Sequence, residues 1–318
     1  MPRHIPVLLN EVIESLDLEP GEQVVDCTLG DGGHAEKILE KIAPGGKVLG
    51  IDADPESLIR AKQFLYSFGE RVIFVRNNFK NLKKIISEND FKPSVILMDL
   101  GWSTPQFKER KKGFSFDLPG GEDEPLDMRY ETEYRSQNTE VRVENSETNQ
   151  TASGLLNNLS KENLEKIFRE YGEEKFAKDI AEKIVEFRKN NKLETTGQLT
   201  ELILQVYREK LGTEKEVPWV GKIHPATKVF QALRIAVNDE LNILKQVLPE
   251  AISVLESGGR LAVISFHSLE DRIVKHYFQS IDGQLGKMIN KKPIVASEPE
   301  LKANQSSRSA KLRVFKKN

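Results

Sequence analysis

The first hundred residues show two alternating patterns of apolar positions. Short runs rich in Val, Ile and Leu are separated by stretches in which apolar residues recur at every third or fourth position. The runs span residues 23–25, 47–51, 71–75 and 94–98, and residues 7–16 show the helical spacing before the first run. Short runs are typical of buried strands, and the wider spacing is typical of helices that bury one face. Strands that alternate with helices predict a parallel sheet.

The alternation stops just beyond the fourth run. Residues 105–215 carry mainly helical patterns, and within them residues 131–151 hold few apolar side chains. A segment so poor in apolar surface cannot form a core, so we expect a flexible polar loop there. The pattern predicts a mainly helical domain at 105–215, inserted into an α/β domain made of residues 1–104 and 216–318.

Sheet-like patterns return near the C-terminus. Helical spacing from His224 onward predicts one long helix, which Pro249 should kink or divide because proline lacks the N–H that a helix interior needs. Residues 260–266 predict a fifth strand and residues 311–315 a last short one. Residues 280–309 between them are polar and predict irregular structure.

The composition limits the class of protein. The chain has 318 residues, a net charge of −2 and one cysteine. The cysteine count excludes an intramolecular disulfide and a cysteine-based zinc cluster, and no metal is expected. The sequence has no run long and apolar enough for a membrane span and no apolar core of a signal peptide, so we expect a cytoplasmic protein without membrane contact.

The turn after the first strand is rich in glycine. Residues 26–34 read Asp-Cys-Thr-Leu-Gly-Asp-Gly-Gly-His and lead into a helical pattern. Glycines allow a sharp turn and close approach of a ligand, and a helix start offers free N–H groups. The second strand ends in Asp52, 20 residues after Gly32, where an acid suits the two hydroxyls of a ribose. This pattern predicts a nucleotide-type cofactor site.

Two cofactors compete for this site. An NAD site usually has a third glycine at a place where this chain has none, which disfavours an NAD(P)-linked oxidoreductase. The acid that leads into the loop, Asp26, resembles the first motif of doubly wound S-adenosylmethionine-dependent methyltransferases. Phe79, just beyond the third strand, is placed to lie against an adenine ring, although an ordinary core aromatic fits the pattern equally well.

The end of the fourth strand carries a second candidate motif, in which Asp99 is followed by a tight turn and an aromatic residue. This resembles the fourth motif of methyltransferases that act on amino groups. Such an amine has its lone pair delocalised into the ring, and acceptors for its hydrogens favour the nucleophilic geometry and stabilise the developing positive charge. The alternative is an Asp that only caps the turn.

Two further residues bear on the reaction. Methylation of a pyrimidine at C5 needs a cysteine nucleophile, and Cys27 lies in the first strand with no acid–base motif beside it, which favours an exocyclic or hydroxyl target. His267 follows the fifth strand at the same edge of the sheet, as a base or a base-binding group, with a helix-capping role of Ser268 as the structural alternative.

Taken together, these stretches resemble the bacterial ribosomal RNA small-subunit methyltransferase H family, which methylates N4 of a cytidine in the decoding region of 16S RNA. The matching segments are residues 4–12, 26–34, 50–55, 99–106, 113–116, 125–129, 171–177, 224–227, 230–234, 238–241 and 265–272. The resemblance implies a doubly wound, mostly parallel, Rossmann-like class I methyltransferase sheet with an inserted helical domain. It also implies the small ribosomal subunit as partner.

Carried over by motif, the resemblance assigns residues to roles. S-adenosylmethionine binding falls to Gly32, Gly33, His34, Asp52, Phe79, Asp99 and Gln106. Asp99 and His267 are the catalytic candidates, and the basic run Arg110, Lys111 and Lys112 is the RNA-binding candidate. Trp102 and Lys108 depart from the usual family pattern. A non-catalytic RNA-binding factor is disfavoured by the intact glycines and acids, and the oligomeric state, a homodimer included, stays open.

Overall fold

The structure is a computed structural model that describes residues 5–101, 111–115, 123–130, 150–212 and 223–318. The expected polar loop at 131–151 falls almost entirely outside these residues. The chain divides into two compact units, a sheet unit of Met1–Ser103 with Leu241–Asn318 and a helical unit of Thr104–Glu240. Each unit is described by itself. Among the described residues no helix combines the length and the apolar character that a membrane span requires.

One eight-stranded sheet forms the centre of the sheet unit, with the strand order β3-β2-β1-β4-β5-β8-β6, and β7 also pairs with β8. The strands are β1 (Gln23–Asp26), β2 (Lys47–Asp52), β3 (Val72–Arg76), β4 (Val95–Asp99), β5 (Arg260–Ser265), β6 (Gly286–Met288), β7 (Ile294–Val295) and β8 (Lys311–Lys317). The first five pair in parallel, and β6 and β7 pair with β8 antiparallel, as β5 does. The expected doubly wound, mostly parallel fold is confirmed.

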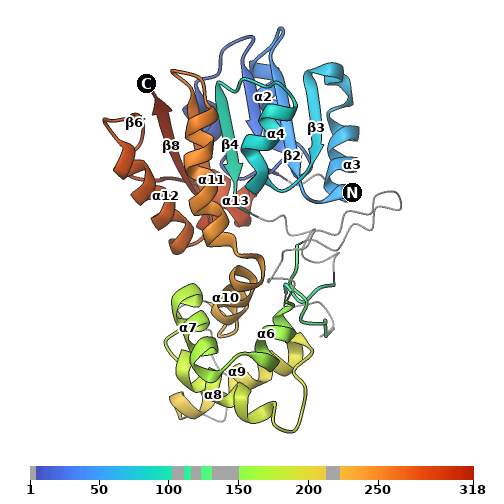
Figure 1. The fold of residues 1–318 in the computed structure, drawn as a ribbon, viewed down its shortest axis with the longest axis vertical. Helices are drawn as coiled ribbons and strands as arrows, with labels where there is room; N and C mark the ends of the chain where they lie inside the picture. The colour runs from blue at the N-terminus through green and yellow to red at the C-terminus, as the bar shows by residue number, and fades with distance from the viewer. Residues whose placement is uncertain (1–4, 102–110, 116–122, 131–149, 213–222) are drawn as a thin grey trace. The chain divides into compact units, whose positions relative to one another are not determined.

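Helices cover both faces of this sheet (Figure 1). Neighbouring strand residues such as Val24 and Val25 point to opposite faces and enter different apolar clusters. One face packs on α1 (Leu9–Leu16), α2 (Gly33–Lys41) and α3 (Pro55–Phe64). The other packs on α4 (Leu82–Glu88), α11 (Glu240–Val254) and α12 (Ser268–Ile281). Short 3-10 turns are η1 (Tyr66–Arg71), η2 (Phe79–Asn81) and η3 (Gln305–Ser309).

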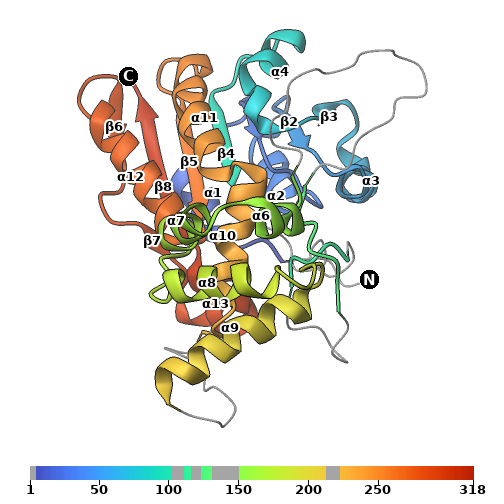
Figure 2. The same cartoon turned by 60° about the horizontal axis from the view of Figure 1, so that its bottom comes forward.

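The helical unit contains α6 (Ala152–Asn158), α7 (Lys161–Gly172), α8 (Ala177–Phe187), α9 (Thr196–Leu211) and α10 (Thr227–Asn238). Figure 2 shows α9 running beside α8. The helices share one apolar core that includes Phe168, Ile184, Ile203 and Leu233. Because α10 packs on α7, the helical unit extends to Glu240 rather than ending at 215 as we expected.

Two other expectations about elements are wrong. The expected long helix from His224 breaks at Asp239, which adopts a left-handed conformation (φ 52°), and not at Pro249, which lies inside α11. Asp and Asn tolerate this conformation better than most residues, and the Asn238 side chain bonds the Met128 carbonyl nearby. The expected irregular segment 280–309 contains β6, β7 and the short helix α13 (Glu298–Ala303).

Candidate active site

The glycine turn joins β1 to α2 at the carboxyl edge of the parallel strands. Gly30 and Gly32 both have positive φ angles, 53° and 81°, which favour glycine. A Cβ on Gly32 would lie 2.9 Å from Leu65 Cδ1, and one on Gly33 would lie 2.3 Å from Pro6 Cγ. Leu65 and Pro6 therefore pack closely against the turn, which leaves no room for side chains larger than glycine at these two positions. Gly32 is the N-cap of α2, so the first turn of this helix begins at this edge.

Asp52 at the end of β2 holds this turn directly. One carboxylate oxygen accepts a hydrogen bond from the Gly30 N–H at 2.8 Å, and the other accepts one from the Asp54 N–H at 2.8 Å. An ionised carboxylate has about four acceptor positions, so two backbone bonds alone do not occupy all of them. The structure thus joins Asp52 to the glycine turn as the spacing predicted.

Asp99 lies at the end of β4, at the same edge. Its Oδ1 accepts a hydrogen bond from the Gly101 N–H at 3.0 Å, and its backbone N–H donates to the Thr28 hydroxyl at 2.8 Å. Burial is the main cause that raises the pKa of this carboxyl to about 7. The side chain is 19% exposed, so part of it is open to a ligand. A Cβ at Gly101 would meet the Phe266 ring at 2.3 Å, which explains the glycine there.

Asp26, at the end of β1, is a second acid at this edge and is only 2% exposed. Its Oδ1 accepts a hydrogen bond from the Thr28 N–H at 3.1 Å. Burial raises the pKa of Asp26 to about 7, and the nearby charge of Asp52 adds to the shift. From sequence we had used Asp26 only as the acid leading into the turn and had not singled out Thr28. The Asp-x-Thr spacing is the signal that could have pointed to both.

His34 in the first turn of α2 joins the cluster. The side chain is nearly buried, and its Nε2 lies 3.0 Å from the Val7 carbonyl oxygen. Because a carbonyl only accepts, Nε2 carries a hydrogen, and the neutral ring then leaves Nδ1 as an acceptor. Nδ1 lies 3.9 Å from Asp99 Oδ2, which is too long for a hydrogen bond but close enough for a charge on either group to affect the other.

Phe79 begins η2, just after β3, as expected from the sequence. Its side chain is half-buried and packs against the apolar cluster that contains Ile51 and Met98. This environment suits a core aromatic with one accessible side. The interpretation of Phe79 as an adenine contact and its interpretation as a core residue both agree with it.

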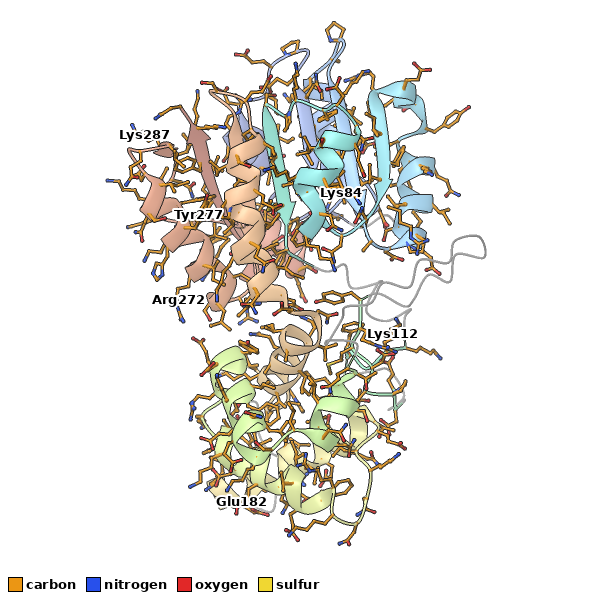
Figure 3. The ribbon with its side chains drawn as sticks, viewed as in Figure 1. Lys84, Lys112, Glu182, Arg272, Tyr277 and Lys287 are labelled. Atoms are coloured by element: carbon orange, nitrogen blue, oxygen red, sulfur yellow. The ribbon has the colours of Figure 1, made fainter. Side chains whose placement is uncertain are left out.

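The remaining candidates for cofactor binding and RNA binding are only partly described. Gln106 and Arg110 lie outside the described residues, as do Trp102 and Lys108. Lys111 and Lys112 belong to the helical unit, where Lys112 (Figure 3) donates a hydrogen bond to the Arg129 carbonyl at 3.3 Å. These two residues therefore place positive charge on that unit next to Gly113, whose N–H bonds the buried Glu124 at 2.8 Å.

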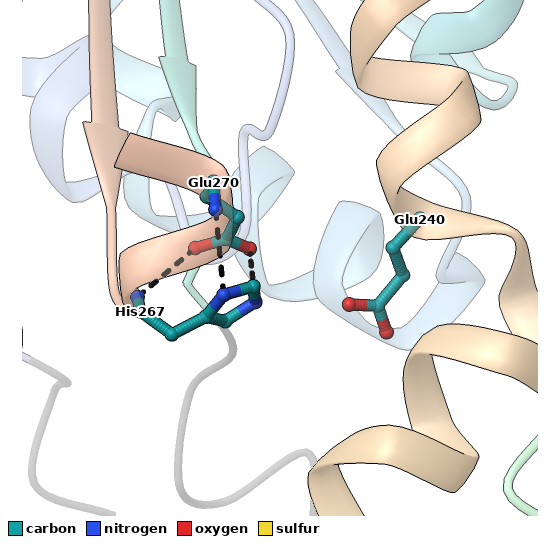
Figure 4. Close-up of side chains that lie close together, drawn as sticks. All are labelled: Glu240, His267 and Glu270. Carbon is teal, nitrogen blue, oxygen red and sulfur yellow. Dashed lines mark hydrogen bonds and ion pairs between the residues drawn. The ribbon is translucent and has the colours of Figure 1, made fainter. Parts of the chain in front are cut away.

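His267 has a structural role in the fold (Figure 4). It is the N-cap of α12, where its Nδ1 accepts a hydrogen bond from the Glu270 N–H at 3.4 Å. The Glu270 carboxylate returns the contact, accepting bonds from the Phe266 N–H at 2.8 Å and the His267 N–H at 3.3 Å. This reciprocal pair is a capping box. The capping residue is therefore His267 and not Ser268 as expected, and the catalytic role of His267 stays a prediction.

The residues at this edge have the chemistry that S-adenosylmethionine requires. A carboxylate on Asp52 suits a ribose, the glycine turn allows a close approach of the cofactor, and Asp99 supplies a partly exposed acceptor beside it. Burial raises the pKa of Asp26 and of the partly exposed Asp99 to about 7. Buried acids with raised pKa values at the ligand-binding edge of an α/β sheet are typical of a functional site.

Comparison with known proteins identifies the family of this chain. The model of the MraW methylase family matches residues 1–318. The chain belongs to this family. The relatives include the ribosomal RNA small subunit methyltransferase H of Clostridium botulinum, 42% identical over 99% of this chain and 99% of that protein. The protein of the same name from Heliobacterium modesticaldum is 42% identical over 99% of this chain and 98% of its own length.

Membership in the methylase family confirms the expected methyltransferase class and, with it, S-adenosylmethionine as the cofactor. Among solved structures, the chain is similar to a putative rRNA-methylase from Clostridium thermocellum, with a TM-score of 0.46 and 12% identity over 99% of this chain and 100% of that one. That likeness is too low to add an argument.

Proposed function

We propose that this chain transfers a methyl group from S-adenosylmethionine to N4 of a cytidine in the decoding region of 16S ribosomal RNA. The names of the relatives support ribosomal RNA of the small subunit as substrate. The observation that carries the choice of an amine is Asp99. Its carboxyl is fixed through Oδ1 by the Gly101 N–H, and part of the side chain is open at the ligand-binding edge.

The role of Asp99 follows from the chemistry of the amine. The cofactor supplies a methyl group on a sulfonium, and the nitrogen–methyl bond forms as the sulfur–methyl bond breaks. The Asp99 carboxylate accepts the amine hydrogens, which holds the nitrogen in its nucleophilic geometry and stabilises its developing positive charge. A pKa of about 7 also lets Asp99 take up the proton that the amine releases.

The same edge disfavours methylation at the ring carbon C5. That reaction needs a cysteine thiolate to attack the base. Cys27 is the single cysteine of the chain, and it is buried in a way that raises the pKa of its thiol well above the usual range. A thiol held neutral by burial is a poor nucleophile.

The remaining roles follow the family pattern. Asp52 binds the ribose hydroxyls, Gly32, Gly33 and His34 line the cofactor, and Phe79 lies against the adenine. Gln106 contributes to the cofactor site, and His267 contacts the base. Arg110, Lys111 and Lys112 bind RNA phosphates. With a net charge of −2, this short basic run is too weak for naked RNA, so an assembled or nearly assembled small subunit is the preferred substrate. The cytoplasm is the location this substrate implies.

Methyl transfer from labelled cofactor to small subunits that lack the modification tests this function. Digestion to nucleosides should then give labelled N4-methylcytidine at one position in the decoding region. A label at C5 or on a ribose would contradict the proposed target, and no label in RNA would contradict the substrate. A short naked oligonucleotide with the same sequence should be methylated far more slowly, because the particle presents the base unpaired and at a fixed place.

A further inference from the structure

Strands β1 and β4 are joined at their carboxyl ends by a side chain rather than by backbone alone. Their parallel ladder aligns Asp26 with Leu97, and the Cys27 N–H donates to the Leu97 carbonyl at 2.9 Å. Two residues further along β4, the Asp99 N–H donates to the Thr28 hydroxyl at 2.8 Å. Thr28 therefore fixes the backbone of Asp99, whose carboxyl lies at the ligand-binding edge.

Thr28 also contacts Asp26, the acid at the end of β1, through its backbone N–H. Asp26 accepts a hydrogen bond from the Thr28 N–H at 3.1 Å, and Thr28 partly offsets the effect of burial, which raises the pKa of Asp26. Thr28 is thus a bridge between two acids that lie on neighbouring strands.

We propose that Thr28 and Asp26 are positioning residues for Asp99, which fix the end of β4 and set the charge that the Asp99 carboxyl carries when it meets the acceptor amine. This inference rests on the proposed methyl transfer to an amine. Neither residue need touch the substrate, since Asp26 is 2% exposed and Thr28 acts through its bonds to the two acids.

The charges around the pair give the direction of the effect. Asp99 faces His34 on α2 at 3.9 Å, Asp26 on β1 and Glu270 on α12, and the last two raise its pKa by repulsion. Asp26 in turn faces Asp52 on β2. Removing the negative charge of Asp26 should therefore favour ionised Asp99, while removing the Thr28 hydroxyl should leave the Asp99 N–H without its acceptor.

The Thr28 part of the proposal is tested by Thr28→Val and Thr28→Ser in the full chain. Valine keeps the shape and removes the hydroxyl that accepts the Asp99 N–H, which should lower kcat on unmethylated small subunits by about tenfold or more, since an unpaired buried N–H is costly. Serine keeps the hydroxyl and should restore most of kcat. Thr200→Val is the matched control, because among the described residues the Thr200 hydroxyl has no hydrogen-bond partner.

The measurements separate positioning from folding and from cofactor binding. The KM for the cofactor and the melting temperature are recorded for each variant. A lower kcat with an unchanged KM for the cofactor, rescued by serine, supports the proposal. Equal kcat for Thr28→Val and wild type, or a loss that serine does not rescue, overturns it. If the wild type itself gives no N4-methylcytidine, the proposed function fails instead, and the two failures are distinguishable.

The Asp26 part is tested by the pH profile of kcat. The profile of the wild type should fall as pH drops through about 7, because protonated Asp99 no longer accepts both amine hydrogens. In Asp26→Asn this acidic limb should move to lower pH, because the repulsion that disfavours ionised Asp99 is gone. A limb that moves supports the proposal. A limb that stays in place, with kcat changed only by a constant factor, shows that Asp26 is merely structural and overturns it.

Discussion

Buried carboxylates occur in both units of the chain, but their surroundings differ. In the helical unit, Glu174 is 3% exposed and accepts bonds from the Phe176 N–H at 2.9 Å and from the Tyr207 hydroxyl at 2.9 and 3.0 Å. In the sheet unit, Asp26 and Asp99 have pKa values raised to about 7, with burial as the main cause. Glu174 joins two helices through its hydrogen bonds, whereas Asp26 and Asp99 lie at the ligand-binding edge, where the effect of burial outweighs the hydrogen bonds that they accept.

This difference separates structural acids from reactive ones. A buried carboxylate with several donors holds chain segments together, as Glu174 holds the start of α8 to α9. A carboxyl whose pKa is raised by burial is destabilising when ionised, and such groups are typical of functional sites. The contrast predicts opposite outcomes when the two kinds of acid are replaced by their neutral amides.

The largest expected effect is on methyl transfer by Asp99→Asn. The Asn side chain presents a single, uncharged acceptor oxygen. It can no longer accept hydrogen bonds from both amine hydrogens or stabilise the positive charge on the nitrogen. We expect kcat to fall by about 10²- to 10³-fold, as when one group that stabilises a transition state is removed. Single-turnover transfer at saturating cofactor measures this, with cofactor affinity determined alongside. Turnover near that of the wild type would exclude Asp99 from the reaction.

The next effect concerns stability and its dependence on pH. Because the pKa of Asp26 is raised from 3.8 to about 7, the folded state binds a proton more tightly than the unfolded state. The stability of the wild type therefore falls as pH rises from about 4 to 7, and the loss is complete above the folded pKa. Asp26→Asn removes this titration and should be more stable than the wild type at pH 8, by up to about 4 kcal/mol. Denaturant unfolding at pH 8 and pH 4 measures the difference, which should vanish at pH 4.

Glu174→Gln is the matched variant in the helical unit and should behave in the opposite way. Glutamine offers one acceptor oxygen where the carboxylate offered two, so a bond from Phe176 or Tyr207 is weakened. We expect a loss of about 1–3 kcal/mol. If Asp26→Asn also destabilises the protein at pH 8, the distinction between the two kinds of buried acid is wrong.

Much of this site could be predicted from the sequence because its signals are local. The glycine turn, Asp52 and Asp99 each follow a strand, and carboxyl ends of parallel strands meet at one edge. The bridge from Thr28 to Asp26 and Asp99 could not be predicted, because it depends on the register between β1 and β4, which the spacing along one chain does not define.

The position of the helix break also depends on contacts between residues far apart in sequence. Pro249 is the stronger local signal, yet α11 continues through it, because Leu244, Val247 and Leu248 pack on the sheet and outweigh the loss of one hydrogen bond. The break at Asp239 instead accompanies tertiary bonds of Asn238 to the 123–130 segment, such as the one to Met128. Those bonds join residues far apart in sequence, and no local pattern reports them.

A smaller effect is expected at Asp52. Asp52→Ala should weaken S-adenosylmethionine binding by about 1.5–3 kcal/mol for each hydrogen bond lost to the charged group. Part of this loss acts through the glycine turn, since Asp52 also holds the Gly30 N–H. Calorimetry measures the affinity, and Glu88→Ala, which removes an exposed acid on α4 of the same unit, is the control. Unchanged affinity in Asp52→Ala would remove this residue from the cofactor site.

The smallest effect is expected in the helical unit, where basic residues rather than acids carry the proposed function. Replacing Arg110, Lys111 and Lys112 by glutamine should weaken binding to small subunits and make it less dependent on salt. Each lost phosphate contact should reduce the slope of log affinity against log salt by about 0.7–0.9, because fewer counterions are released. Cofactor affinity should not change. The matched control replaces Lys83 and Lys84, exposed lysines on α4, by glutamine and should leave the slope as in the wild type. An equal loss of slope in both variants would mean that the subunit responds to overall charge, and the assignment of this basic run as an RNA contact would be wrong.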